Sequence, residues 1–105
     1  MSRQRFAEQV VVVTGAGRGV GQAVALAFAA EGAKVVVNDI NPLGVDATVE
    51  QITAAGGQAL AAVADVSAKM AVQTFMYAAI EAYGGVDVLV NNAGVHPKAN
   101  LLQMD

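Results

Sequence analysis

A glycine-rich stretch, TGAGRGVG, spans Thr14 to Gly21 and directly follows a run of valines. Its glycines stand at every second position: Gly15, Gly17, Gly19 and Gly21. Glycine loses more backbone freedom on folding than any other residue, so its repetition indicates a need for bare backbone. A helix N-terminus presents unpaired N–H groups and a partial positive charge, and it can hold a phosphate where no side chain intervenes. The stretch therefore predicts a pyrophosphate-binding turn, with a ligand-free tight turn as the alternative.

The spacing of these glycines narrows the class of site. It matches neither the dinucleotide fingerprint G-x-G-x-x-G nor the P-loop, in which Lys-Ser or Lys-Thr follows the glycines. It does match T-G-x-x-x-G-x-G, through Thr14, Gly15, Gly19 and Gly21. Gly21 falls in the first turn of the expected helix, where a missing side chain would let helix and strand pack closely.

Two acidic residues follow apolar segments further along the chain. Asp39 closes one of them, where a carboxylate can accept both hydroxyls of an adenosine ribose. The alternative for Asp39 is an exposed loop residue or a helix N-cap. Asp65 and Val66 follow the next apolar segment, where the aspartate could reach an adenine amino group or cap a helix.

The sequence NNAG, residues 91–94, follows a fourth apolar segment. Asn91 and Asn92 are costly to bury without hydrogen-bond partners, and Ala93 and Gly94 again leave backbone accessible. This pattern is typical of a ligand-binding loop, with a simple asparagine turn as the alternative.

The elements that must position these motifs alternate between strand and helix. Apolar runs predict strands at Val10–Val13, Val35–Val37, Ala59–Ala64 and Val86–Val90. Helical stripes predict helices that begin at Val20, after an N-cap at Asn41 and after an N-cap at Ser67. This β-α-β-α-β-α-β order predicts an α/β domain over residues 1–105 with a parallel sheet. All the motifs then lie at the carboxyl ends of strands, where open α/β sheets bind ligands.

The combination of TGAGRGVG, Asp39, Asp65-Val66 and NNAG resembles the short-chain dehydrogenases/reductases, particularly their classical branch. The resemblance implies a Rossmann-like three-layer α/β/α fold with strand order 3-2-1-4, truncated relative to the full family fold. It also implies an NAD(P)-dependent oxidoreductase that transfers hydride between nicotinamide and a carbonyl or alcohol substrate. The cofactor-binding residues that it implies are Gly15, Arg18, Gly19, Val20, Gly21, Asp39, Ile40, Asp65, Val66, Asn92, Ala93 and Gly94, with Asn91 stabilising the central strand.

The catalytic serine and Tyr-x-x-x-Lys pair of that family have no counterpart in this sequence. Tyr77 and Tyr83 are followed four positions later by Glu81 and Asp87, and we expect both tyrosines to serve packing or the surface of a helix. The lone His96 is expected to be a solvated loop residue. No catalytic residue is therefore assigned. The chain is expected to be the N-terminal cofactor-binding half of an oxidoreductase, with a non-catalytic dinucleotide-binding module as the alternative.

Asp39 and Arg18 favour opposite cofactors. A carboxylate facing the 2′ position would repel the phosphate of NADP, whereas Arg18 could pair either with that phosphate or with Asp39. Ile40 supplies no second cation, so we expect NAD rather than NADP.

Composition excludes several classes of protein. The chain has 105 residues, a formal net charge of −3 and no cysteine, so we expect no nucleic-acid partner, no disulfide and no thiolate metal site, and we assign no metal ligand. Its longest uncharged stretch, residues 51–64, is shorter than the roughly 20 residues of a membrane-spanning helix, and we expect a cytoplasmic protein. An uncovered edge of the fourth strand predicts self-association or a homo-oligomer.

Overall fold

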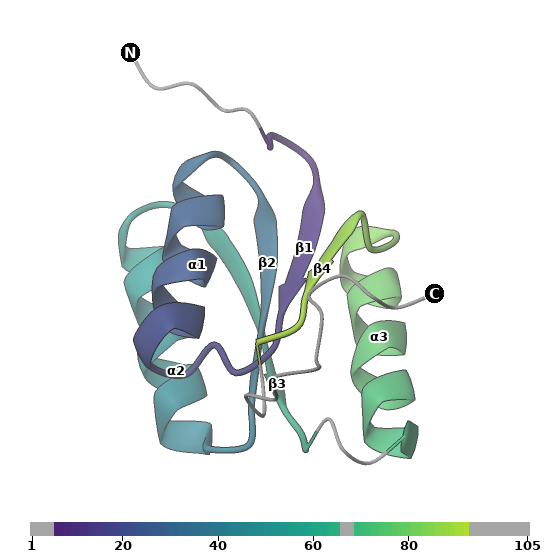
Figure 1. Ribbon diagram of the computed structural model, residues 1–105. Helices are drawn as coiled ribbons and strands as arrows, with labels where there is room; N and C mark the ends of the chain where they lie inside the picture. Colours follow the sequence, from purple (N-terminus) through teal and green to yellow (C-terminus); the bar gives the residue numbers. More distant parts are fainter. Residues whose placement is uncertain (1–5, 66–68, 93–105) are drawn as a thin grey trace.

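A parallel sheet lies between helices in the computed structural model, which describes residues 6–65 and 69–92 (Figure 1). The elements in chain order are β1 (Val10–Val13), α1 (Gly19–Ala30), β2 (Lys34–Asp39), α2 (Pro42–Ala54), β3 (Gln58–Val63), α3 (Lys69–Tyr83) and β4 (Val88–Val90). Helices α1 and α2 cover one face of the sheet, and α3 covers the other. The predicted three-layer α/β/α architecture is therefore confirmed.

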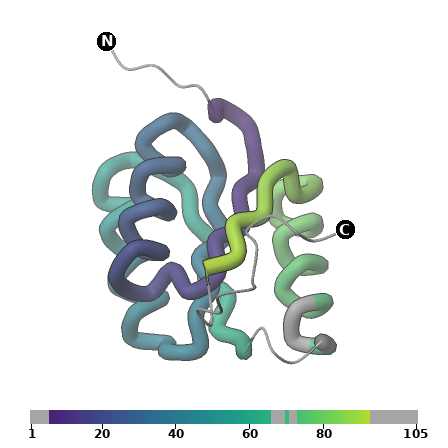
Figure 2. Tube along the Cα trace, viewed as in Figure 1, coloured from purple at the N-terminus to yellow at the C-terminus, as the bar shows by residue number. Residues whose placement is uncertain are grey.

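The four strands run parallel in the order β3-β2-β1-β4. Val13 at the end of β1 is in register with Val37 of β2 and with Val90 of β4. The chain thus reverses its direction of travel across the sheet between β1 and β4, which is the position at which doubly wound sheets bind ligands. Figure 2 shows that the glycine-rich turn after β1 passes across this end of the sheet.

The valines of β1 and β2 form the centre of two apolar layers. Val11 and Val35 face the layer under α1 and α2, and Val12 and Val36 face the layer under α3. All four are fully buried. Strands buried on both faces need apolar residues at every position, which explains why these runs show no polar alternation.

Helix α2 begins as its sequence predicts. Asn41 is the N-cap, and its side chain accepts a hydrogen bond from the backbone N–H of Leu43 at 2.9 Å. Pro42 occupies the first turn, where its missing N–H costs no helical hydrogen bond. Ser67, the predicted N-cap of α3, lies outside the described residues.

The fourth strand is shorter than predicted, because pairing with β1 starts at Val88 rather than Val86. Asp87, the residue before β4, pairs with Val10 through hydrogen bonds. Its carboxylate accepts a hydrogen bond from the N–H of Val10 at 2.8 Å, and its own N–H donates to the carbonyl of Val10, also at 2.8 Å. Val86 packs on the α3 side of the core before the strand begins.

Candidate cofactor-binding site

The glycine-rich turn connects β1 to α1 and contains two glycines in the left-handed backbone conformation. Gly15 has a φ of 62° and Gly19 a φ of 58°, a region that other residues rarely adopt. Between them, the N–H of Ala16 donates to the carbonyl of Asn38 at 2.7 Å. The turn is therefore fixed to the end of β2, and α1 starts immediately after it.

The first turn of α1 leaves its amides available. Within the part of the chain that the structure describes, the N–H groups of Gly19, Val20 and Gly21 donate no hydrogen bond. Arg18 is the N-cap and its side chain makes no capping bond, and the first turn carries no acidic residue. Unpaired amides and the positive end of the helix dipole suit an anion at this point.

Gly21 allows the helix to approach the turn and Asn92, which follows β4, closely. A Cβ atom at this position would lie 2.0 Å from the carbonyl oxygen of Gly15 and 2.7 Å from Nδ2 of Asn92. Both contacts are shorter than side chains tolerate, so only glycine fits there. Gly21 thus serves close packing, as expected, but its partners are the turn and Asn92 rather than the strand that the sequence predicted.

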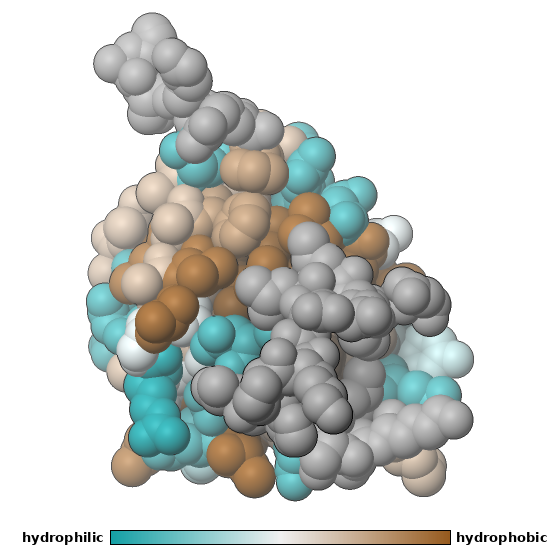
Figure 3. Space-filling view, in the orientation of Figure 1, coloured by the Kyte–Doolittle hydropathy of each residue, from teal (hydrophilic) through white to brown (hydrophobic). Residues whose placement is uncertain are grey.

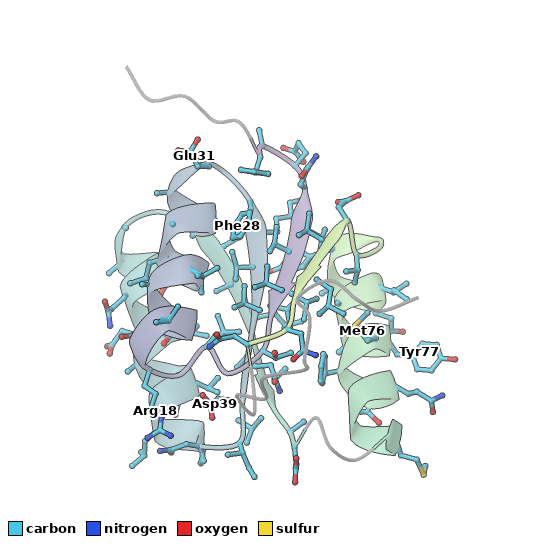
Figure 4. All side chains as sticks on the ribbon, in the orientation of Figure 1. Arg18, Phe28, Glu31, Asp39, Met76 and Tyr77 are labelled. Atoms are coloured by element: carbon cyan, nitrogen blue, oxygen red, sulfur yellow. The ribbon has the colours of Figure 1, made fainter. Side chains whose placement is uncertain are left out.

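Asp39 reaches back from the end of β2 to the glycine turn. Its Oδ2 accepts a hydrogen bond from the N–H of Gly17 at 2.9 Å, and its Oδ1 accepts from the N–H groups of Ile40 and Asn41 at 2.7 and 3.2 Å. The N-cap of α2 is Asn41, so Asp39 is not that cap. Figure 4 shows Asp39 and Arg18 at the same end of the molecule, and among the described residues neither side chain forms an ion pair.

The first two residues of NNAG are tied to the turn through Thr14. The hydroxyl of Thr14 lies 3.0 Å from Oδ1 of Asn91 and accepts a hydrogen bond from the N–H of Asn92 at 2.7 Å. Nδ2 of Asn92 lies 3.5 Å from the carbonyl oxygen of Gly15. The end of β4 and the glycine turn therefore form one surface. A simple asparagine turn would not need these contacts with Thr14 and Gly15.

Two exposed apolar side chains flank this surface. Val20 and Ile40 are 71% and 65% exposed. Figure 3 shows apolar and polar surface interleaved on this face of the molecule. Asp65 lies at the exposed end of β3, beyond Val63.

The remaining expected positions divide into two groups. Val66, Ala93, Gly94 and His96 lie outside the described residues. Tyr77 and Tyr83 lie on α3, and Tyr77 is exposed to solvent (Figure 4).

Tyr83 lies at the opposite end of the sheet from the glycine turn. The Nζ of Lys34, the first residue of β2, lies 5.8 Å from the centroid of its ring. Partial burial raises the pKa of Tyr83 above its usual value. The contact with Lys34 and the partial burial fit the packing role that the sequence predicts for this tyrosine.

Three residues that the sequence analysis did not assign to the site hold the turn in place: Gly17, Thr48 and Gln22. The buried hydroxyl of Thr48 donates to the carbonyl of Ala16 at 2.9 Å and accepts from Nε2 of Gln22 at 2.9 Å. Gly17 could have been predicted from the alternation of glycines. Thr48 could have been predicted because it is a hydroxyl residue within the apolar stripe of α2.

A family model described as short chain dehydrogenase matches residues 9–105. The chain belongs to the short-chain dehydrogenase family. The match begins just before β1 and includes the glycine turn, Asp39 and the NNAG sequence.

The curated relatives of this chain are longer than the chain itself. An uncharacterized oxidoreductase of Methylorubrum extorquens is 52% identical over 89 residues, which are 84% of this chain and 36% of the relative. The meso-2,3-butanediol dehydrogenase of Serratia marcescens is 44% identical over 99 residues, which are 94% of this chain and 39% of the relative. The chain thus spans well under half the length of both proteins.

A solved structure has a fold similar to that of this chain. It is a 7α-hydroxysteroid dehydrogenase in complex with NADH and 7-oxo glycochenodeoxycholic acid, with a TM-score of 0.85 and 40% identity. The match covers 89% of this chain and 36% of that protein.

The described part of the chain shows neither a cluster of metal ligands nor a membrane-spanning helix. Residues 6–65 and 69–92 contain no group of three or more acidic, histidine or cysteine residues that could hold a metal ion. None of the helices in those ranges is long and apolar enough to cross a membrane.

Proposed function

We propose that the chain binds a nicotinamide dinucleotide at the carboxyl end of its sheet. The free amides at the start of α1 would hold the pyrophosphate, and Asp39 would accept hydrogen bonds from the adenosine ribose. The observation that carries the proposal is the 2.9 Å hydrogen bond from Gly17 N–H to Asp39 Oδ2, since it brings the carboxylate beside the turn. Gly19 leaves bare backbone beside these amides, because a Cβ atom there would meet nothing within 4 Å.

The proposed binding residues follow the strand ends. Their complete set is Gly15, Arg18, Gly19, Val20, Gly21, Asp39, Ile40, Asp65, Val66, Asn92, Ala93 and Gly94. Asn92 supports this assignment because it lies against both Gly15 and Gly21. Val20 and Ile40 supply exposed apolar surface for the ribose and adenine.

We expect NAD(H) to bind more tightly than NADP(H). Among the described residues no cation pairs with Asp39, so a 2′-phosphate would meet a carboxylate without a neutralising partner. One such charge pair at about 4 Å costs about 4 kcal/mol at an effective dielectric constant near 20. Arg18 could offset part of this repulsion by pairing with the phosphate.

Hydride transfer between nicotinamide and a carbonyl or alcohol carbon is our proposal for the whole protein. The bound cofactor would supply or accept the hydride, and this chain would orient it and hold its phosphates. Tyr77 and Tyr83 lack the lysine four positions later that the family uses beside its catalytic tyrosine. For these 105 residues by themselves, binding without turnover is therefore the second candidate function. We likewise propose, from the sequence, that the protein is cytoplasmic.

Isothermal titration with NADH and NADPH tests the binding proposal. We expect NADH to bind at least about tenfold more tightly, and Asp39→Ala to remove most of this difference by deleting the repelling charge. Asp46→Ala, an exposed carboxylate on α2, is the control and should leave both affinities unchanged. Equal affinities in the unmutated protein would refute the NAD preference, and absence of binding would refute the proposed site.

A further inference from the structure

We propose that Gly17 determines cofactor specificity by fixing the carboxylate of Asp39. This inference rests on the proposed dinucleotide site and deepens it. Gly17 contributes in two ways, through its N–H group and through its missing side chain. The N–H donates to Oδ2 of Asp39 at 2.9 Å, and the bare Cα leaves the space that the carboxylate occupies.

The space beside Gly17 is too small for a side chain. A Cβ atom at this position would lie 2.8 Å from Oδ2 of Asp39 and 3.1 Å from both its Cβ and its Cγ. The first distance is shorter than real Cβ contacts, so either the turn or the aspartate would have to shift. Gly17 is buried and its φ does not require glycine, so contact rather than backbone conformation limits the residue type.

Helix α2 prevents the turn from moving away. A Cβ atom on Gly44 would lie 2.7 Å from the carbonyl oxygen of Gly17 and 3.0 Å from its Cα. The two backbones are therefore in direct contact, and the turn has no free space on that side.

Ala16, the preceding residue, is held on both sides of its peptide backbone. Its N–H donates to the carbonyl of Asn38 at 2.7 Å, and its carbonyl accepts from the hydroxyl of Thr48 at 2.9 Å. The side chain of Asp39 has two rotatable bonds and ends in the clashing atom. An added methyl group at residue 17 would therefore displace the carboxylate rather than the turn.

The displaced carboxylate would change discrimination more than overall affinity. Without the N–H of Gly17, Asp39 keeps only the amides of Ile40 and Asn41 as partners on Oδ1. Its charge would then no longer be held at the turn, where the ribose 2′ position is proposed to lie. The ratio of NADH to NADPH affinity reports this position, because general loss of structure weakens both cofactors alike.

A double-mutant cycle tests the inference by titration of both cofactors. Gly17→Ala should lower the NADH/NADPH affinity ratio by about tenfold, within the usual range for directly coupled residues. In the Asp39→Ala background, the same glycine substitution should leave the ratio unchanged. Gly17→Ala that lowers the ratio equally in both backgrounds would overturn the inference.

Gly57→Ala is the matched control. Its Cβ atom would lie 2.9 Å from Cγ2 of Ile52, a clash of the same size at the far end of α2. It should lower thermal stability without changing the ratio.

Asp39→Glu is the second test and applies even if Gly17→Ala does not fold. This substitution keeps the negative charge but moves the carboxylate, because the glutamate side chain is longer. The NADH/NADPH affinity ratio should therefore fall.

An unchanged ratio in Asp39→Glu would show that the carboxylate position set by Gly17 is irrelevant and would overturn the inference. Failure of the unmutated protein to bind either cofactor would instead overturn the proposed function. The two failures are therefore distinguishable in the same set of titrations.

Discussion

At the scale of single residues, the shape of the glycine turn depends on a buried hydroxyl from another element. Thr48 of α2 is fully buried and lies between the carbonyl of Ala16 and the side-chain amide of Gln22 on α1. A buried polar group that loses its partner retains the cost of its desolvation. Thr48 thus connects both helices of this layer to the proposed phosphate-binding turn.

Thr48→Val should destabilise the fold and weaken cofactor binding. The substitution keeps the shape but removes a donor and an acceptor, so we expect a loss of about 1–3 kcal/mol in the free energy of unfolding. NADH affinity should fall several-fold because the turn is less well held. Thr53→Val is the control, since that hydroxyl is exposed and bonds to its own helix at Val49. Equal effects of the two substitutions, measured by urea unfolding and titration, would contradict this role.

Residue types and spacing predicted that the motifs share one end of the sheet, but not the contacts between them. Gly15, Asp39 and Asn92 were chosen from the sequence, and the structure brings all three to one end of the sheet. The Gly17–Asp39 hydrogen bond was not predicted, because it depends on the side-chain torsions of the aspartate. The position of Thr48 opposite Ala16 depends on how α2 packs, which a local pattern does not specify.

At the scale of elements, the start of α2 positions both Asp39 and the turn. Asn41 caps the helix through its side chain and donates its N–H to Oδ1 of Asp39 at 3.2 Å. Gly44 in the first turn of the helix contacts Gly17. The N-terminus of α2 is therefore part of the proposed site.

Asn41→Ala should lower the free energy of unfolding by about 1 kcal/mol, because the N–H of Leu43 loses its acceptor. Asn41→Asp keeps an oxygen in the same position and should be close to neutral. Thermal unfolding followed by circular dichroism measures both. A loss of stability in Asn41→Asp as large as in Asn41→Ala would show that capping is not the cause.

Element boundaries were predictable where local chemistry sets them. The Asn41-Pro42 pair gave the start of α2, and the apolar run of β1 gave that strand. The start of β4 was not predictable from hydrophobicity, since Val86 is as apolar as Val88. The backbone and carboxylate of Asp87, which pair with Val10, decide where that strand begins.

At the scale of the whole molecule, strand order brings distant segments together. Periodicity predicted alternating strands and helices, whereas the order 3-2-1-4 came from the family resemblance and is confirmed. Periodicity could not supply the order, because several arrangements bury the same apolar residues. Once β4 pairs with β1, Thr14 and Asn91 become neighbours although they are far apart in sequence.

The outer edge of β4 should make these 105 residues self-associate when they are prepared by themselves. Among the described residues, β4 pairs only with β1, and its valines and leucine are half-buried. Unpaired strand edges favour pairing with another chain. Sedimentation velocity should show dimers or larger species that increase with concentration. A monomer across the concentration range would contradict this expectation.

Residue-resolved NMR of the isotopically labelled chain during titration with NAD tests the proposed site most directly. The backbone amide signals of Gly19, Val20 and Gly21 should shift progressively and reach saturation. Lys34 and Tyr83, at the opposite end of the sheet, should shift little. Larger shifts at Lys34 and Tyr83, or no saturable shift at the start of α1, would contradict the proposal that these amides hold a dinucleotide.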